Sequence, residues 1–149
     1  MLETAVVETP RDVAEATGTL PGQPIFRINR LRTFEQRPLA FHEAYLPIEI
    51  GKQLSGLDLT RTSIIREIDR TLKIPSREAY QRVEAVCADT GLARMLDVAL
   101  GAPLLYVTRL VRQLDGRLLV LFRSHFRADR YYYTVEIAPA RKRPAKVRP

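Results

Sequence analysis

The stretch LLYVTRLVRQLDGRLLVLFRSHF, residues 104–126, holds two long runs of strand-forming residues that meet at Asp115 and Gly116. An Asp-Gly pair between two apolar runs is the strongest short-range signal of a β-hairpin. The stretch therefore predicts two long strands, over 104–114 and 118–126, joined by a tight turn. A chain that contains this hairpin builds at least part of its fold around an antiparallel sheet.

The residues on either side of this hairpin predict further strands and a few short helices. Alternating patterns place strands over 2–7, 25–32, 39–46 and 131–138, whereas residues 78–88 are extended but less clearly patterned. Helices are expected over 12–16, from Thr62 or Ser63 onward and from Asp89 or Thr90 onward, with a loop over 51–60. Because strands outnumber helices and most links are hairpin-sized, the expected fold class is α+β, with a single antiparallel sheet and the helices packed on one face.

Length and composition describe one soluble domain. The 149 residues, 46% of them hydrophobic, are enough for a single core. No run of about 18 uncharged apolar residues exists, and the N-terminal residues lack the layout of a signal peptide, so we expect a cytoplasmic protein without membrane contact. Cys87 is the only cysteine and there are two histidines, so we expect no internal disulfide, no metal and no other cofactor.

The formal charge of +7 is concentrated at the C-terminal end. The last residues, PARKRPAKVRP, hold five positive charges and no negative one, so the rest of the chain carries only +2. We expect residues 1–138 to form the domain and 139–149 to be a basic, disordered tail, with an electrostatic arm for DNA or membrane as the alternative.

In two of the predicted strands, the alternation of side chains between the two faces places charged residues on the same face as apolar ones. Arg30 and Arg32 share one strand face with Phe26. Glu43 lies in the more aromatic row of the next strand, so a buried Glu43 would need Arg30 or Arg32 as its partner. This trio is either an ion pair at the sheet edge or a pocket floor, in which the arginines bind an anionic group and Glu43 binds a hydroxyl or amine. Ser63 opens a helix, where its ordinary role is capping and its alternative role is binding an anion.

The stretch FRADRYYYTVEI, which precedes the tail, combines polar and aromatic residues at the start of a predicted strand. Asp129 can satisfy the backbone of a turn while Arg127 or Arg130 neutralises its charge. Tyr131 and Tyr133 lead one face of the strand and are either core tyrosines or hydroxyls that reach a ligand.

Taken in order, these features resemble the UTRA domain, the effector-sensing module of the HutC subgroup of GntR-type bacterial transcription regulators. The resemblance runs from about residue 6 to 137 and rests on the R-L-R strand, the E-x-x-L-P ending, the A-x-x-L-x-V-x-x-G-x-P-L-L passage and the R-x-D-R-Y motif. It implies a fold similar to chorismate lyase and a small-molecule pocket on the sheet. It places Arg30, Arg32, Glu43 and Ser63 at the ligand, and Asp129 with Tyr131 matches its R-x-D-R-Y element. We add Arg127 and Tyr133 of the same segment to the expected effector-binding residues. Phe126, Ile65 and the FEQRP turn depart from the family pattern.

The resemblance favours a ligand sensor that acts as a homodimer. Arg30 and Arg32 on one strand face, with Ser63 at a helix start, predict an anionic or carboxylate-bearing effector. Regulators of this type contact DNA through a winged helix-turn-helix that precedes the sensor, and the residues before position 25 could not supply a recognition helix. One alternative is an enzyme resembling chorismate lyase, with Arg30 and Arg32 holding a carboxylated substrate and Glu43 acting as an acid. Another is a basic module that binds protein or RNA.

Overall fold

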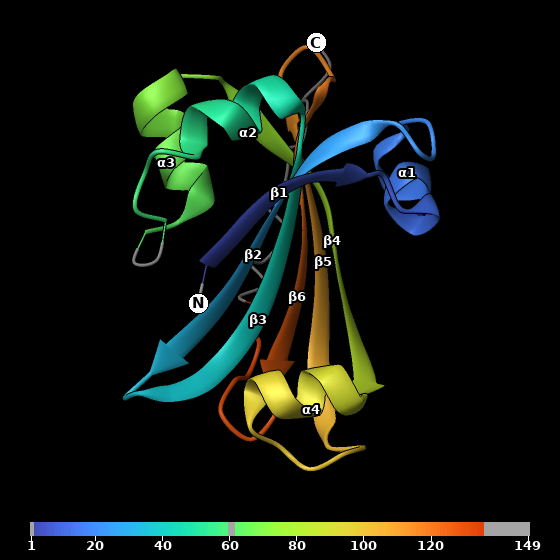
Figure 1. Ribbon diagram of the computed structural model, residues 1–149, viewed down its shortest axis with the longest axis vertical. Coiled ribbons are helices and arrows are strands. Elements are labelled where there is room, and N and C mark those ends of the chain that lie inside the picture. The colour runs from blue at the N-terminus through green and yellow to red at the C-terminus, as the bar shows by residue number, and fades with distance from the viewer. Residues whose placement is uncertain (1, 60–61, 136–149) are drawn as a thin grey trace, which may run out of the picture.

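The computed structural model describes residues 2–59 and 62–135 (Figure 1). Six strands form one sheet in the order β1-β2-β3-β6-β5-β4, and every neighbouring pair is antiparallel. The predicted α+β class with a single antiparallel sheet is therefore confirmed. The strands are β1 Leu2–Glu8, β2 Pro24–Phe34, β3 Arg37–Leu46, β4 Ser76–Cys87, β5 Pro103–Gln113 and β6 Leu118–Arg127; the helices are α1 Arg11–Thr17, α2 Ile48–Leu54, α3 Ile64–Leu72 and α4 Thr90–Leu96.

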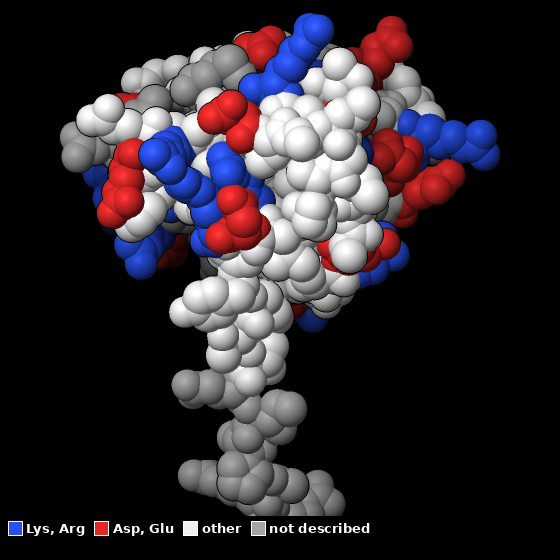
Figure 2. Space-filling view, turned by 90° about the horizontal axis from the view of Figure 1, so that it is seen from below, with Lys and Arg blue, Asp and Glu red and all other residues white. Residues whose placement is uncertain are grey.

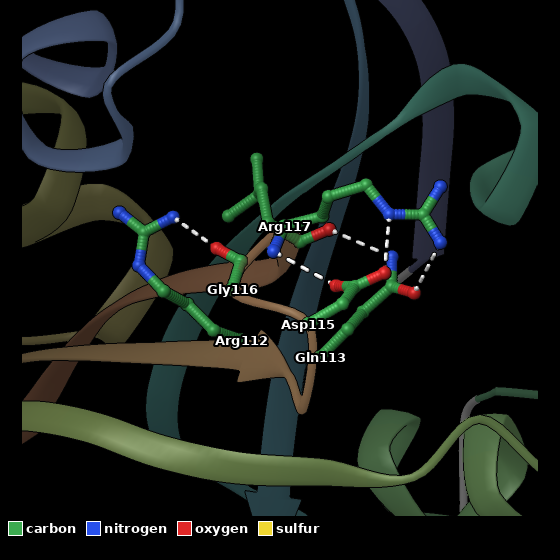
Figure 3. A network of polar contacts seen from close by, with 6 residues as sticks. Arg112, Gln113, Asp115, Gly116 and Arg117 are labelled. Atoms are coloured by element: carbon green, nitrogen blue, oxygen red, sulfur yellow. Dashed lines mark hydrogen bonds and ion pairs between the residues drawn. The ribbon is translucent and has the colours of Figure 1, made fainter.

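The β5–β6 hairpin forms as the sequence predicts, and hydrogen bonds from polar side chains stabilise its turn (Figure 3). Gly116 has a φ of 91°, a conformation that favours glycine. Asp115 accepts hydrogen bonds from the backbone N–H of Arg117 at 3.0 Å and from its Nε at 2.7 Å, and these bonds lower the pKa of Asp115. Arg112 donates to the carbonyl of Gly116 at 3.1 Å and to that of Thr17 at 3.0 Å, so the turn is also tied to the end of α1.

Both faces of the sheet are apolar, and helices cover both. Phe26 of β2 packs in one cluster with Leu54 of α2 and with buried residues of α3. Its neighbour Ile25 points to the other side and packs with Val13 of α1, and Leu96 of α4 belongs to a further cluster on that side. We call the side of Phe26 the α3 face and the side of Ile25 the α1 face. The helices thus do not all lie on one face as expected, because apolar rows on both sides of the sheet need cover.

Two segments differ from the sequence-based expectation. A helix, α2, occupies part of the stretch expected to be a loop, and it is held by Ile50 and Leu54, which are both buried one turn apart. Residues 131–135 are not a strand, because β6 already has β3 and β5 on its two edges. The other residues of that predicted strand, 136–138, and the predicted tail, 139–149, lie outside the described residues. No helix in the described ranges has the length and apolarity needed to cross a membrane.

Candidate functional site

A cavity of about 230 Å³ lies on the α3 face, between the sheet and the start of α3. Its floor comes from β2, β3, β6, β5 and β4, which each contribute side chains from the same face because their registers align these rows. Two kinds of residue line it. The polar ones are Arg30, Arg32, His42, Ser63, Gln81, Arg109 and Ser124, and the apolar or aromatic ones are Ile64, Ile65, Val107, Phe122, Phe126, Tyr131 and Tyr133.

Arg30 connects the cavity floor to the segment that leads into α3. The residue is buried, and its Nη1 donates to the carbonyl of Leu59 at 2.8 Å and to that of Thr62 at 2.5 Å. Burial and the nearby charge of Arg32 lower the pKa of Arg30. Its Nε is buried without a hydrogen-bond partner in the described structure. Arg30 is therefore a structural clamp that keeps one donor unpaired.

Two further arginines give the cavity an excess of positive charge. Arg32 is exposed to solvent in the cavity and makes no hydrogen bond or ion pair with the described residues. Arg109 forms an ion pair with Glu78 at the outer strand, and its Nε is buried with no hydrogen-bond partner among the described residues. The cavity thus holds three guanidinium groups and only one of them, that of Arg109, is paired with a carboxylate of the described residues. This excess of positive charge suits an anionic ligand.

His42 lies beside Arg30 on the neighbouring strand and adds a neutral polar group to the floor. Its Nδ1 is 2.7 Å from the hydroxyl oxygen of Ser124, while its Nε2 is buried without a partner among the described residues. Burial, together with the charges of Arg30, Arg32 and His125, lowers the pKa of His42 to about 3. The imidazole is therefore uncharged near neutral pH and can offer one hydrogen bond to a ligand through Nε2.

Aromatic rings and a helix start complete the wall. The ring of Tyr131 stacks on Phe126 with centroids 3.9 Å apart, and Phe126 meets the imidazole of His42 edge-on at 5.3 Å. Ser63 stands at the N-cap of α3, but its side chain makes no capping hydrogen bond, so its hydroxyl stays available on the cavity side. The partial positive charge of a helix start favours anions at this point.

A family model described as the UTRA domain matches residues 1–132. The chain belongs to the UTRA domain family. It is 26% identical over 133 residues to the HTH-type transcriptional repressor NagR of Bacillus subtilis, covering 89% of this chain and 54% of NagR. It is 33% identical over 132 residues to an HTH-type transcriptional regulator of Mycobacterium tuberculosis, covering 86% of this chain and 48% of that protein. The chain thus spans about half the length of these curated relatives.

The fold of this UTRA domain matches those of solved regulators. The crystal structure of the ligand-binding domain of a GntR-family regulator from Bordetella bronchiseptica superposes with a TM-score of 0.76 at 23% identity, covering 91% of this chain and 88% of that one. The chain is therefore an effector-binding domain of the kind found in GntR-family transcription regulators. The relatives named here are regulators and not enzymes, in agreement with the expectation of a non-enzymatic domain. Across the described residues, no group of three or more His, Cys, Asp or Glu side chains could hold a metal ion.

The structure brings five of the eight predicted site residues of this UTRA domain to the cavity: Arg30, Arg32, Ser63, Tyr131 and Tyr133. The prediction that Glu43 pairs with Arg30 or Arg32 is wrong, because the register sets His42 opposite Arg30 and turns Glu43 to the α1 face. There Glu43 accepts a hydrogen bond from the Tyr45 hydroxyl at 3.1 Å and lies 3.9 Å from Arg123. Burial and then Glu43 raise the pKa of Tyr45 to about 12.

The remaining two predicted residues, Arg127 and Asp129, lie away from the cavity and bind each other. Their side chains form two hydrogen bonds of 3.0 and 2.8 Å, which confirms the expectation that a flanking arginine neutralises Asp129. Arg127 also donates to the carbonyls of Leu96 and Asp97 at 3.1 and 3.2 Å. Arg127, held by Asp129, therefore caps the C-terminal end of α4.

Sequence reasoning missed His42, Arg109, Gln81 and Ser124. His42 shares its strand face with the small residues Ala40 and Ala44, whereas the prediction from the sequence rested on the aromatic face of the same strand. A polar residue between small ones on a buried strand is the signal that would have found it, since small neighbours leave room for a ligand. The other three are recognisable only once the strand order is known.

Proposed function

We propose that this UTRA domain binds its effector in the cavity of the α3 face and that the effector is anionic. The observation that carries the proposal is the uneven charge of the lining, with three arginines and a single carboxylate as their partner. The buried, unpaired Nε atoms of Arg30 and Arg109 support it, because a ligand oxygen would satisfy donors that the described protein leaves open.

The lining residues differ in charge and in depth, so they suit different groups of a ligand. Arg32 is free to bind an anionic group, and Ser63 with the start of α3 faces the same space. His42 lies deeper and is neutral, so it suits a hydroxyl or another uncharged polar group. A cavity of about 230 Å³ is small for a ligand pocket, which favours a compact metabolite such as a sugar phosphate, a phosphonate or an amino-acid derivative.

We infer that the domain signals as a homodimer and that a separate winged helix-turn-helix contacts DNA. A sensor acts as a switch only if the effector binds two arrangements with different affinities. Arg30 links the floor to the segment before α3, so a ligand that engages its Nε would favour one position of that helix. On the face shown in Figure 2, basic and acidic side chains are intermixed, which gives no support to direct nucleic acid binding there.

A binding experiment with paired variants tests this proposal. Thermal-shift measurements would compare sugar phosphates, phosphonates and carboxylated amino-acid derivatives with their uncharged analogues. Arg32→Ala should markedly reduce stabilisation by the anionic compounds, whereas Arg94→Ala, which removes an exposed arginine of α4 far from the cavity lining, should leave it unchanged. Stabilisation by neutral analogues alone, or an equal loss in both variants, would contradict an anion site at Arg32.

A further inference from the structure

The effector cavity has a second polar end, away from Arg32. Gln81 of β4 and Arg109 of β5 line this end, and they are directly opposite each other in the β4–β5 register. Arg30 and Arg32 of β2 line the other end. β5 is the third strand from β2 in the sheet, so the two backbones are about 14 Å apart. We call these two parts of the cavity the β5 end and the β2 end.

The two ends differ in net charge. At the β5 end, Glu78 forms an ion pair with Arg109 and balances its charge. At the β2 end, Arg30 donates to backbone carbonyls and Arg32 makes no ion pair with the described residues, so two positive charges are unbalanced. The β2 end therefore suits the anionic group of a ligand. A second anionic group at the β5 end would lie near the carboxylate of Glu78, which repels it.

Arg109 still has one donor to offer to a ligand. Its Nε is buried with no hydrogen-bond partner in the described part of the chain, whereas its Nη2 contacts Glu78. Leaving a buried donor unpaired costs free energy, so a ligand atom that accepts a hydrogen bond from this Nε would be stabilised. Gln81 adds the N–H donors of its side-chain amide at the same end. The β5 end thus combines available donors with a balanced charge.

We propose that the β5 end recognises an uncharged carbonyl oxygen of the effector, which accepts hydrogen bonds from the Nε of Arg109 and from the amide of Gln81. This inference rests on the anionic effector proposed above and adds the second group that the domain recognises. A carbonyl oxygen has two lone pairs and no proton, so it can accept from both donors, and it brings no charge next to Glu78. The effector class is therefore a compact anion with an amide or ketone group at its other end.

The floor between the two ends is mainly apolar. On β6, Phe122 lies directly opposite Arg109, and on β5, Val107 lies opposite Ser124. The hydroxyl of Ser124 is within hydrogen-bond distance of His42 Nδ1, so it already has a partner. The part of the effector that joins the anionic group to the carbonyl therefore passes over aromatic and aliphatic side chains, with the Nε2 of His42 as a polar atom on the way. Recognition by hydrogen bonds is thus concentrated at the two ends.

Titration calorimetry of the full chain with matched phosphonates tests this inference. Three probes carry a phosphonate at one end of a chain of three methylene groups, and a carboxamide, a carboxylate or an isopropyl group at the other. Homologues with one methylene fewer or more cover other distances, and the comparison uses the length that binds best. Wild-type protein should bind the amide probe about tenfold or more tightly than the other two. Arg109→Met should remove that preference, because it removes the Nε donor and keeps an apolar stem of similar length.

Three further variants separate recognition at the β5 end from the anion site. Glu78→Gln removes the repelling carboxylate, so its affinity for the carboxylate probe should rise by about tenfold, whereas Glu84→Gln, on the opposite face of β4, should change none of the affinities. A wild type that binds the amide no more tightly than either other probe, or a Glu78→Gln variant without the gain, overturns this inference. The anion site then stands if Arg32→Ala weakens binding of all three probes. Equal affinities in wild type and Arg32→Ala, or no binding of any probe, overturn the anion site itself.

Discussion

Replacing Arg30 tests whether the cavity floor and the start of α3 are held together as the structure indicates. Arg30→Ala removes two hydrogen bonds from a guanidinium to backbone carbonyls, at 2.8 and 2.5 Å. Each hydrogen bond to a charged group contributes about 1.5–3 kcal/mol, and the buried position prevents water from replacing them freely. The cost of burying the charge offsets part of this gain. We therefore expect a net loss of about 3 kcal/mol in the free energy of unfolding.

Urea denaturation with Arg32→Ala as the matched control measures this loss. Arg32 shares the strand and the face of Arg30 but makes no hydrogen bond or ion pair with the described residues, so its replacement should change stability by no more than about 0.5 kcal/mol. For Arg30→Ala the midpoint should fall by about 1–2 M urea, and Arg30→Lys should lose less than Arg30→Ala. Equal midpoints for the two alanine variants would refute the clamp.

Three other predictions follow from the same structure. Burial beside Arg30 and Arg32 lowers the pKa of His42 to about 3 in the folded protein, so the unfolded chain protonates this imidazole more readily. The free energy of unfolding should therefore fall as the pH drops from 6.5 toward 3, by up to about 1.4 kcal/mol per pH unit. His42→Asn should reduce this dependence in denaturation measured at several pH values. Gly51→Ala should lower the melting temperature by the equivalent of about 1–3 kcal/mol, since an added Cβ would overlap the ring of Phe26; an unchanged melting temperature would show that α2 shifts at no cost. Truncation after Ala138 should leave the melting temperature unchanged, because the removed residues lack apolar periodicity, and a large loss would disprove the predicted tail.

Local sequence patterns predicted those parts of the fold that local chemistry determines. The Asp-Gly pair at 115 and 116 specified a turn whose conformation needs glycine, and the hairpin formed around it. Strand alternation placed Arg30 and Arg32 on one face, and both line the cavity. These features depend on residues a few positions apart, so they were recognisable without knowledge of the fold.

The features that sequence did not predict depend on which strands become neighbours. The choice between Glu43 and His42 as the polar group beside Arg30 is set by the β2–β3 register, and a shift of one residue exchanges the two faces. The segment after β6 has the alternation of a strand but no free edge next to it. Arg109 reaches the cavity only because β5 follows β6 in the sheet. Long-range strand order decides each of these cases.

The affinity of wild-type protein and of Arg32→Ala for one anionic effector tests the central claim most directly. The compound is the sugar phosphate, phosphonate or carboxylated amino-acid derivative that stabilises the wild type most in a thermal-shift screen, and calorimetry gives both dissociation constants. The account predicts that Arg32→Ala weakens binding by about 10- to 150-fold, equivalent to the 1.5–3 kcal/mol of a hydrogen bond to a charged group, with unchanged stability of the free protein. Equal dissociation constants for the two proteins would contradict it.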